Sequence, residues 1–192
     1  MHLSLTDPVT VLLFLAIIVT IAILGRRVLR RRRLKTAGLQ KKFGSEYGRA
    51  VREQGSERKA EANLEDREKR VDKLDIRELE LWERERFLKQ WESVQSRFVD
   101  SPMGAIAEAD DLVSSIMKAR GYPVADFDQR ADDISVDHPR VVENYRAAHE
   151  IALRAGRDLA TTEELRTAMI HYRSLFQELA QGPATVDRRD VA

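Results

Sequence analysis

The sequence contains no cysteine and has few glycine, proline and aromatic residues. Of its 192 residues, nine are glycine, five are proline and 6% are aromatic. The absence of cysteine excludes a disulfide scaffold, a thiol nucleophile and a cysteine-ligated zinc site. The glycines are scattered singly, and GxGxxG, Walker, GxSxG and HExxH motifs are all missing. We therefore expect no cofactor and no enzymatic activity.

The charged residues are plentiful but unevenly distributed along the chain. The formal net charge is only +1, yet residues 26–42 carry nine basic side chains and no acidic one. Residues 43–192 carry 24 basic and 31 acidic side chains. The sequence therefore divides into a basic segment and a mildly acidic body.

An apolar run stands before the basic segment. Residues 9–24 read VTVLLFLAIIVTIAIL, and Pro8 and Gly25 extend the run to 18 residues. At about 1.5 Å per residue this length gives about 27 Å, close to the thickness of a bilayer core. We predict a transmembrane helix at 8–25, preceded by a short outer N-terminus at 1–7. A cleavable signal peptide is the alternative, but it would carry its positive charge before the apolar run.

The basic residues set the predicted orientation. By the positive-inside rule, the chain would be a single-pass inner (plasma) membrane protein with its N-terminus outside and its C-terminal domain cytoplasmic. The polybasic juxtamembrane segment 26–42 would then contact the lipid bilayer and its anionic head groups. Nucleic acid is a weaker partner, because no aromatic residue interleaves with the arginines. The predicted membrane-interface residues are Arg26, Arg27, Arg30, Arg31, Arg32, Arg33 and Lys35.

The remaining chain shows helical periodicity and no alternating pattern typical of strands. The predicted fold class is all-α: an N-terminal transmembrane helix, a charge-rich helix, and a small cytosolic helical bundle. We assign 43–78 to a charged helical region with a coiled-coil-like alternative, 79–181 to the bundle, and 182–192 to a disordered tail.

Start and stop signals define several helices within the body. Gly55 should end one helix and Ser56 should begin the next. A helix should start at Pro102 and end at Gly121. Asp137, His138 and Pro139 should open another helix, and a capping box formed by Thr161 and Glu164 should begin the last one. In the helix at about 79–99, we expect Trp91, Val94 and Phe98 to dock onto the bundle.

Among the remaining candidates, which are four histidines and several acidic pairs, two histidines give the sharpest hypothesis for chemistry. His149 and His171 are expected on the last two helices, where they could face one another as metal ligands or acid–base groups. A hydrogen-bonded histidine at the edge of a core is the more common arrangement. Neither helix carries the Glu-x-x-His repeat of a di-iron bundle. We therefore assign no catalytic or metal residue and keep His149 and His171 as weak candidates.

Several phrases of the sequence resemble a family of uncharacterised bacterial membrane-anchored proteins. They are RFVDSPMGAIAEADDLVSSIMKARGYPV at 97–124, SVDHPRVVENYRAAH at 135–149, HYRSLFQELA at 171–180, FGSEYGRAV at 43–51 and LDIREL at 74–79. Similar sequences often have proline where this chain has Glu78. The resemblance implies an N-terminal span and a helical body, and it brings no assigned activity.

The sequence thus favours an interaction or scaffold module over an enzyme. Its partner would be an unknown cytosolic protein or a second copy of the chain, associating through the charged helix at 56–73. The alternative is a membrane-tethered enzyme or metal protein that uses His149, His171 and nearby carboxylates.

Overall fold

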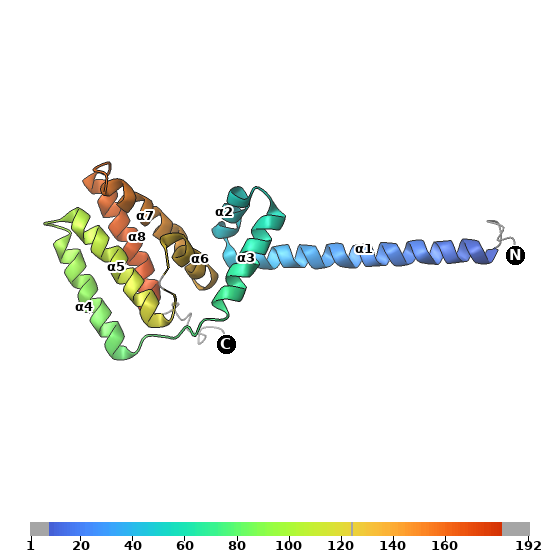
Figure 1. Ribbon diagram of the computed structural model, residues 1–192, viewed down its shortest axis with the longest axis horizontal. Helices are drawn as coiled ribbons and strands as arrows, with labels where there is room; N and C mark the ends of the chain where they lie inside the picture. Colours follow the sequence, from blue (N-terminus) through green and yellow to red (C-terminus); the bar gives the residue numbers. More distant parts are fainter. Residues whose placement is uncertain (1–7, 124, 182–192) are drawn as a thin grey trace, which may run out of the picture. The chain divides into compact units, whose positions relative to one another are not determined.

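The computed structural model describes residues 8–123 and 125–181, and these residues form eight α-helices and no strand (Figure 1). The all-helical prediction is confirmed. The chain forms two compact units, Met1–Lys41 and Lys42–Ala192. The outer N-terminus expected at 1–7 and the disordered tail expected at 182–192 lie outside the described residues.

The first unit consists of most of α1, which runs from Pro8 to Phe43. Across the described residues, no helix has the combination of length and apolar character needed to cross a membrane. The predicted transmembrane helix at 8–25 is therefore wrong, as are the single-pass topology and the inner-membrane location built on it. The prediction treated the apolar run as a separate element. In the structure one 36-residue helix continues from that run through all nine basic residues, whose segment accounts for its second half.

The second unit begins with a helical hairpin. Helix α2, Ser45–Gln54, ends at Gly55, which has a φ of 70°, and α3, Glu57–Val71, starts at Ser56. The Ser56 hydroxyl accepts a hydrogen bond from the Lys59 backbone N–H at 3.4 Å, so both predicted boundaries are confirmed. The two helices pack on each other and α3 also packs on α6. Phe43, at the end of α1, is buried, and so are five apolar residues of the hairpin: Tyr47, Ala50, Ala60, Leu64 and Val71.

The burial of α3 bears on the coiled-coil-like alternative. Its apolar stripe is covered by α2 and α6 of the same chain, and Arg67 in the middle of that stripe is buried as well. This stripe is therefore not available to pair with a second copy while the hairpin is docked.

Five helices form the bundle: α4 (Leu81–Arg97), α5 (Pro102–Arg120), α6 (Phe127–Asp137), α7 (Val142–Ala155) and α8 (Thr162–Gln181). Helix α8 packs along both α5 and α7, and α4 covers α5 and part of α8 (Figure 1). The bundle core runs from Leu79 to Ala180 in sequence and includes no residue of α2 or α3. The buried apolar residues of the hairpin therefore lie outside the bundle core.

Most predicted helix boundaries in the bundle are confirmed. Helix α5 starts at Pro102 and is capped by Gly121, and Glu164 and Thr161 form the expected capping box. The predicted start at Asp137 is wrong, because α6 continues to Asp137 and α7 begins only at Val142. His138 caps α6 instead, and the following proline has no N–H with which to continue the helix.

The segment between α3 and α4 lies against the end of α5. The Arg77 backbone N–H donates to the Arg120 carbonyl at 2.8 Å. Gly121 has a φ of 99°, and a Cβ there would lie 2.2 Å from the Asp75 carbonyl oxygen. Only glycine satisfies both the backbone conformation and this close approach.

Candidate functional site

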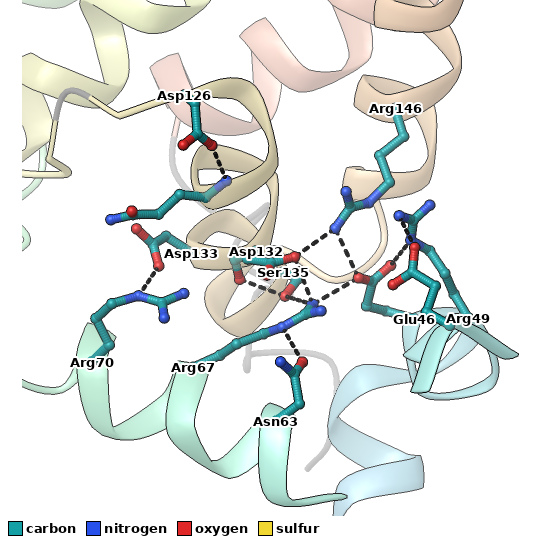
Figure 2. A network of polar contacts seen from close by, with 12 residues as sticks. Glu46, Arg49, Asn63, Arg67, Arg70, Asp126, Asp132, Asp133, Ser135 and Arg146 are labelled. Atoms are coloured by element: carbon teal, nitrogen blue, oxygen red, sulfur yellow. Dashed lines mark hydrogen bonds and ion pairs between the residues drawn. The ribbon is translucent and has the colours of Figure 1, made fainter. Parts of the chain in front are cut away.

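Four charged side chains form a closed ring where the hairpin meets the bundle (Figure 2). Arg67 Nη1 lies 2.8 Å from Glu46 Oε1 and 3.0 Å from Asp132 Oδ1. Arg146 Nη2 lies 3.0 Å from the same Glu46 oxygen and 2.8 Å from the same Asp132 oxygen. Each residue comes from a different helix, namely α2, α3, α6 and α7. The signs alternate around the ring, so every charge has two neighbours of opposite sign.

The ring is buried. Glu46, Arg67 and Arg146 are 2%, 3% and 7% exposed. Burial disfavours the charged form of Arg146, but the carboxylates of Glu46 and Asp132 outweigh this effect, and the pKa of Arg146 is raised. Buried charges need such partners because isolated charges lose their hydration without compensation.

Further polar contacts surround the ring (Figure 2). Arg67 donates from Nε to Asn63 Oδ1 at 2.9 Å and from Nη1 to Ser135 Oγ at 3.3 Å. On the neighbouring turn, Arg70 Nε donates to Asp133 Oδ1 at 2.7 Å. Burial raises the pKa of Asp133 although Arg70 opposes the shift. Its second carboxylate oxygen is buried and has no hydrogen-bond partner in the described part of the chain.

A second feature is an open groove between α4 and α5, which we call the α4–α5 groove. It has a volume of about 740 Å³. Its apolar floor comes from Phe87 and Val94 of α4 and from Leu112 and Ala119 of α5. Its polar lining consists of Arg77, Arg86, Gln90, Ser93, Glu108, Asp111, Ser115 and Lys118.

Some rim charges of the α4–α5 groove are already paired within the chain. Arg77 makes two hydrogen bonds to Glu83, at 2.7 and 2.8 Å, and Glu108 pairs with Arg97. The hydrogen bond from Arg77, helped by the Glu80 backbone N–H, lowers the pKa of Glu83 to about 2. Arg86 instead lies over the rings of Trp82 and Phe87.

The two candidate histidines have different surroundings. The His149 ring stacks on Phe127 with 3.5 Å between centroids, and burial lowers its pKa. His171 is half-buried on α8. Among the described residues, no three His, Asp or Glu side chains are grouped so that they could hold a metal ion. The residues predicted at a membrane interface, Arg26 to Lys35, are exposed on α1.

His138 links three helices through its ring nitrogens, and the sequence did not predict this role. Its Nε2 lies 3.3 Å from Arg120 Nη1, and its Nδ1 lies 3.0 Å from Glu178 Oε1. Because a guanidinium only donates, this geometry makes Nε2 the acceptor and places the proton of a neutral ring on Nδ1, facing the carboxylate. The ring thereby joins the ends of α5, α6 and α8. The sequence signal was Pro139, which indicated a helix boundary but did not show whether a helix begins or ends there.

The comparisons with known proteins do not assign the chain to a family. No protein-family model, curated protein or solved structure matches this chain.

Proposed function

We propose that the helical body is a protein-interaction module and that its docking site is the α4–α5 groove. The observation that carries the proposal is an open, 740 Å³ groove with an apolar floor and a polar rim. This arrangement is the one found where an amphipathic helix lays its apolar face into a groove between helices.

The rim charges define the chemistry of the partner. Arg86 and Lys118 would attract acidic side chains, whereas Asp111 would attract a basic one. A matching segment is therefore an amphipathic helix with an apolar stripe and charges of both signs beside it. Apolar burial would supply the affinity, and the charges would select the orientation of the helix.

The other polar clusters support a binding role over a catalytic one. The ring charges neutralise one another, and His138 already uses both of its ring nitrogens. Groups engaged in this way hold helices together and leave little capacity for substrate. A scaffold that binds through the α4–α5 groove is consistent with polar clusters whose groups are already paired within the chain.

Site-specific photo-crosslinking in cells tests this proposal. A photoreactive side chain at Ser115, an exposed groove residue, should give a defined crosslink to a partner protein. The same group at Thr167, exposed on α8, is the control. Reversing the charges with Arg86→Glu and Lys118→Glu should weaken the Ser115 crosslink at least tenfold.

The proposal fails if Ser115 and Thr167 give the same crosslinked products. It also fails if the double reversal leaves the Ser115 product unchanged, because the groove charges would then play no part in recognition.

A further inference from the structure

The four-charge ring described above has an unusual division between the hairpin and the bundle. Glu46 and Arg67 both belong to the α2–α3 hairpin, and Asp132 and Arg146 both belong to the bundle (Figure 2). One of the four ion pairs therefore lies within the hairpin and one within the bundle, and the other two cross the joint.

This division leaves each of the four ring charges with one partner inside its own part. If the hairpin separates, Glu46 keeps Arg67 and Asp132 keeps Arg146, so neither part retains an unpaired ring charge. The two crossing pairs are lost, but the exposed charges regain hydration. Buried ion pairs contribute little net stability for this reason, because desolvation offsets most of their attraction.

Further polar contacts also cross the joint. Arg67 donates to Ser135 and Arg70 to Asp133, and the burial of Asp133 is itself unfavourable to its charge. The apolar core of the bundle includes no side chain of α2 or α3. The joint therefore combines these polar contacts with the packing of the α3 apolar stripe on α6, outside the bundle core.

The joint is also incompletely packed. A cleft of about 640 Å³ lies between α2 and α7, and another of about 420 Å³ lies between α2, α6 and α7. Arg49 and Arg146 line both clefts, and the Nε atoms of both side chains are buried without a hydrogen-bond partner in the described residues. Water can enter such clefts without displacing apolar side chains.

From these observations we infer that the α2–α3 hairpin is a reversible latch. It docks on α6 and α7 through the charge ring, and it opens as a unit while the bundle stays folded. The crossing pairs Arg67–Asp132 and Glu46–Arg146 decide the docked position. The inference is independent of the α4–α5 groove, which none of the four ring residues lines.

A charge swap within the hairpin tests the latch in the full-length chain. Glu46→Arg combined with Arg67→Glu preserves the ion pair inside the hairpin and the net charge. It places like charges opposite Arg146 and opposite Asp132. Hydrogen exchange of the α2 and α3 amides should become at least tenfold faster, while α5 and α8 stay protected.

The reciprocal swap should restore docking. Adding Asp132→Arg and Arg146→Asp to the first pair recreates opposite charges at every position of the ring, and exchange in α2 and α3 should slow again. The matched control is Asp66→Lys with Lys69→Asp, which exchanges an exposed pair on α3 whose Nζ and Oδ1 atoms are 3.1 Å apart. This control should leave exchange unchanged.

Wild-type protein provides a second test that needs no variant. In low concentrations of urea, the α2 and α3 amides should exchange through an opening that leaves α5 and α8 protected. Equal protection of the hairpin and the bundle in wild type would overturn the inference. So would hairpin exchange that is unaffected by the first swap, or that accelerates only together with exchange in α5 and α8.

Discussion

Replacement of Trp91 by alanine is the sharpest test of how α4 is held on the bundle. Trp91 is 5% exposed, and its ring stacks on Phe176 of α8 with 4.7 Å between centroids and 19° between planes. Both tryptophans of the chain lie on α4, and Trp82 is 60% exposed. Trp82→Ala is therefore a matched control on the same helix.

The expected loss follows from the buried area. A tryptophan side chain removes about 200 Å² from water, which at about 25 cal/mol per Å² corresponds to about 5 kcal/mol. Alanine retains part of this burial, and a compact denatured state reduces the difference, whereas the lost stacking increases it. We expect Trp91→Ala to lower the free energy of unfolding by about 3–5 kcal/mol. Trp82→Ala should lower it by less than about 1 kcal/mol, the value of its exposed contact with Arg86.

Urea unfolding followed by circular dichroism at 222 nm measures both values, with the dependence on urea concentration compared between variants. A loss below about 1 kcal/mol for Trp91→Ala, or equal losses for the two variants, would refute the reasoning. It would mean that α4 is held by contacts other than the Trp91–Phe176 stack.

Three further predictions follow: two concern how Glu83 and His149 make the stability of the protein depend on pH, and the third concerns the strained turn after α5. Because the pKa of Glu83 is lowered to about 2 from an ordinary 4.5, its stabilising effect is complete above 4.5 and is lost as the pH falls toward 2. The difference in urea midpoint between wild type and Glu83→Gln should therefore narrow over that interval, and a constant difference would contradict the pairing with Arg77. Burial lowers the pKa of His149 below 6.5, so acidification from pH 7.5 to 5.5 should lower the melting temperature more in wild type than in His149→Phe, which keeps the stack on Phe127. Equal losses would show that protonation of this ring is not linked to folding. Gly121→Ala should lower the free energy of unfolding by more than about 2 kcal/mol, because of its φ of 99° and the Asp75 carbonyl. Gly48→Ala, inside α2 with room for a Cβ, should be neutral or stabilising by up to about 1 kcal/mol in the same urea titration.

Local signals in the sequence predicted much of the helical body. Gly55 with Ser56, Pro102 with Gly121, and Thr161 with Glu164 each satisfy backbone groups at a helix end, which is a short-range requirement visible in a few residues. The prediction failed at Asp137 because that residue suits a helix start, whereas in the structure it is the last residue of α6. His138 is the C-cap, and its ring contacts Arg120 and Glu178, which are distant in the sequence.

The apolar run at 9–24 shows a limit of composition-based reasoning. Its hydropathy predicted an isolated span, and the structure instead places it at the beginning of one helix that extends through the basic segment to Phe43. A helix continues until residues of low helix propensity or a capping signal end it. No such residue between the apolar run and the basic segment ends α1, so both belong to the same helix.

The sequence by itself determined that this protein is helical, where most helices begin and end, and that its charges are segregated along the chain. Only the tertiary structure decided which charges meet, since Glu46 and Arg146 are 100 residues apart and no local pattern links them. Their pairing depends on how α2 and α3 settle on α6 and α7. The physical reason is that helix ends are satisfied by neighbours in sequence, whereas a buried charge is satisfied by whichever helix packs against it.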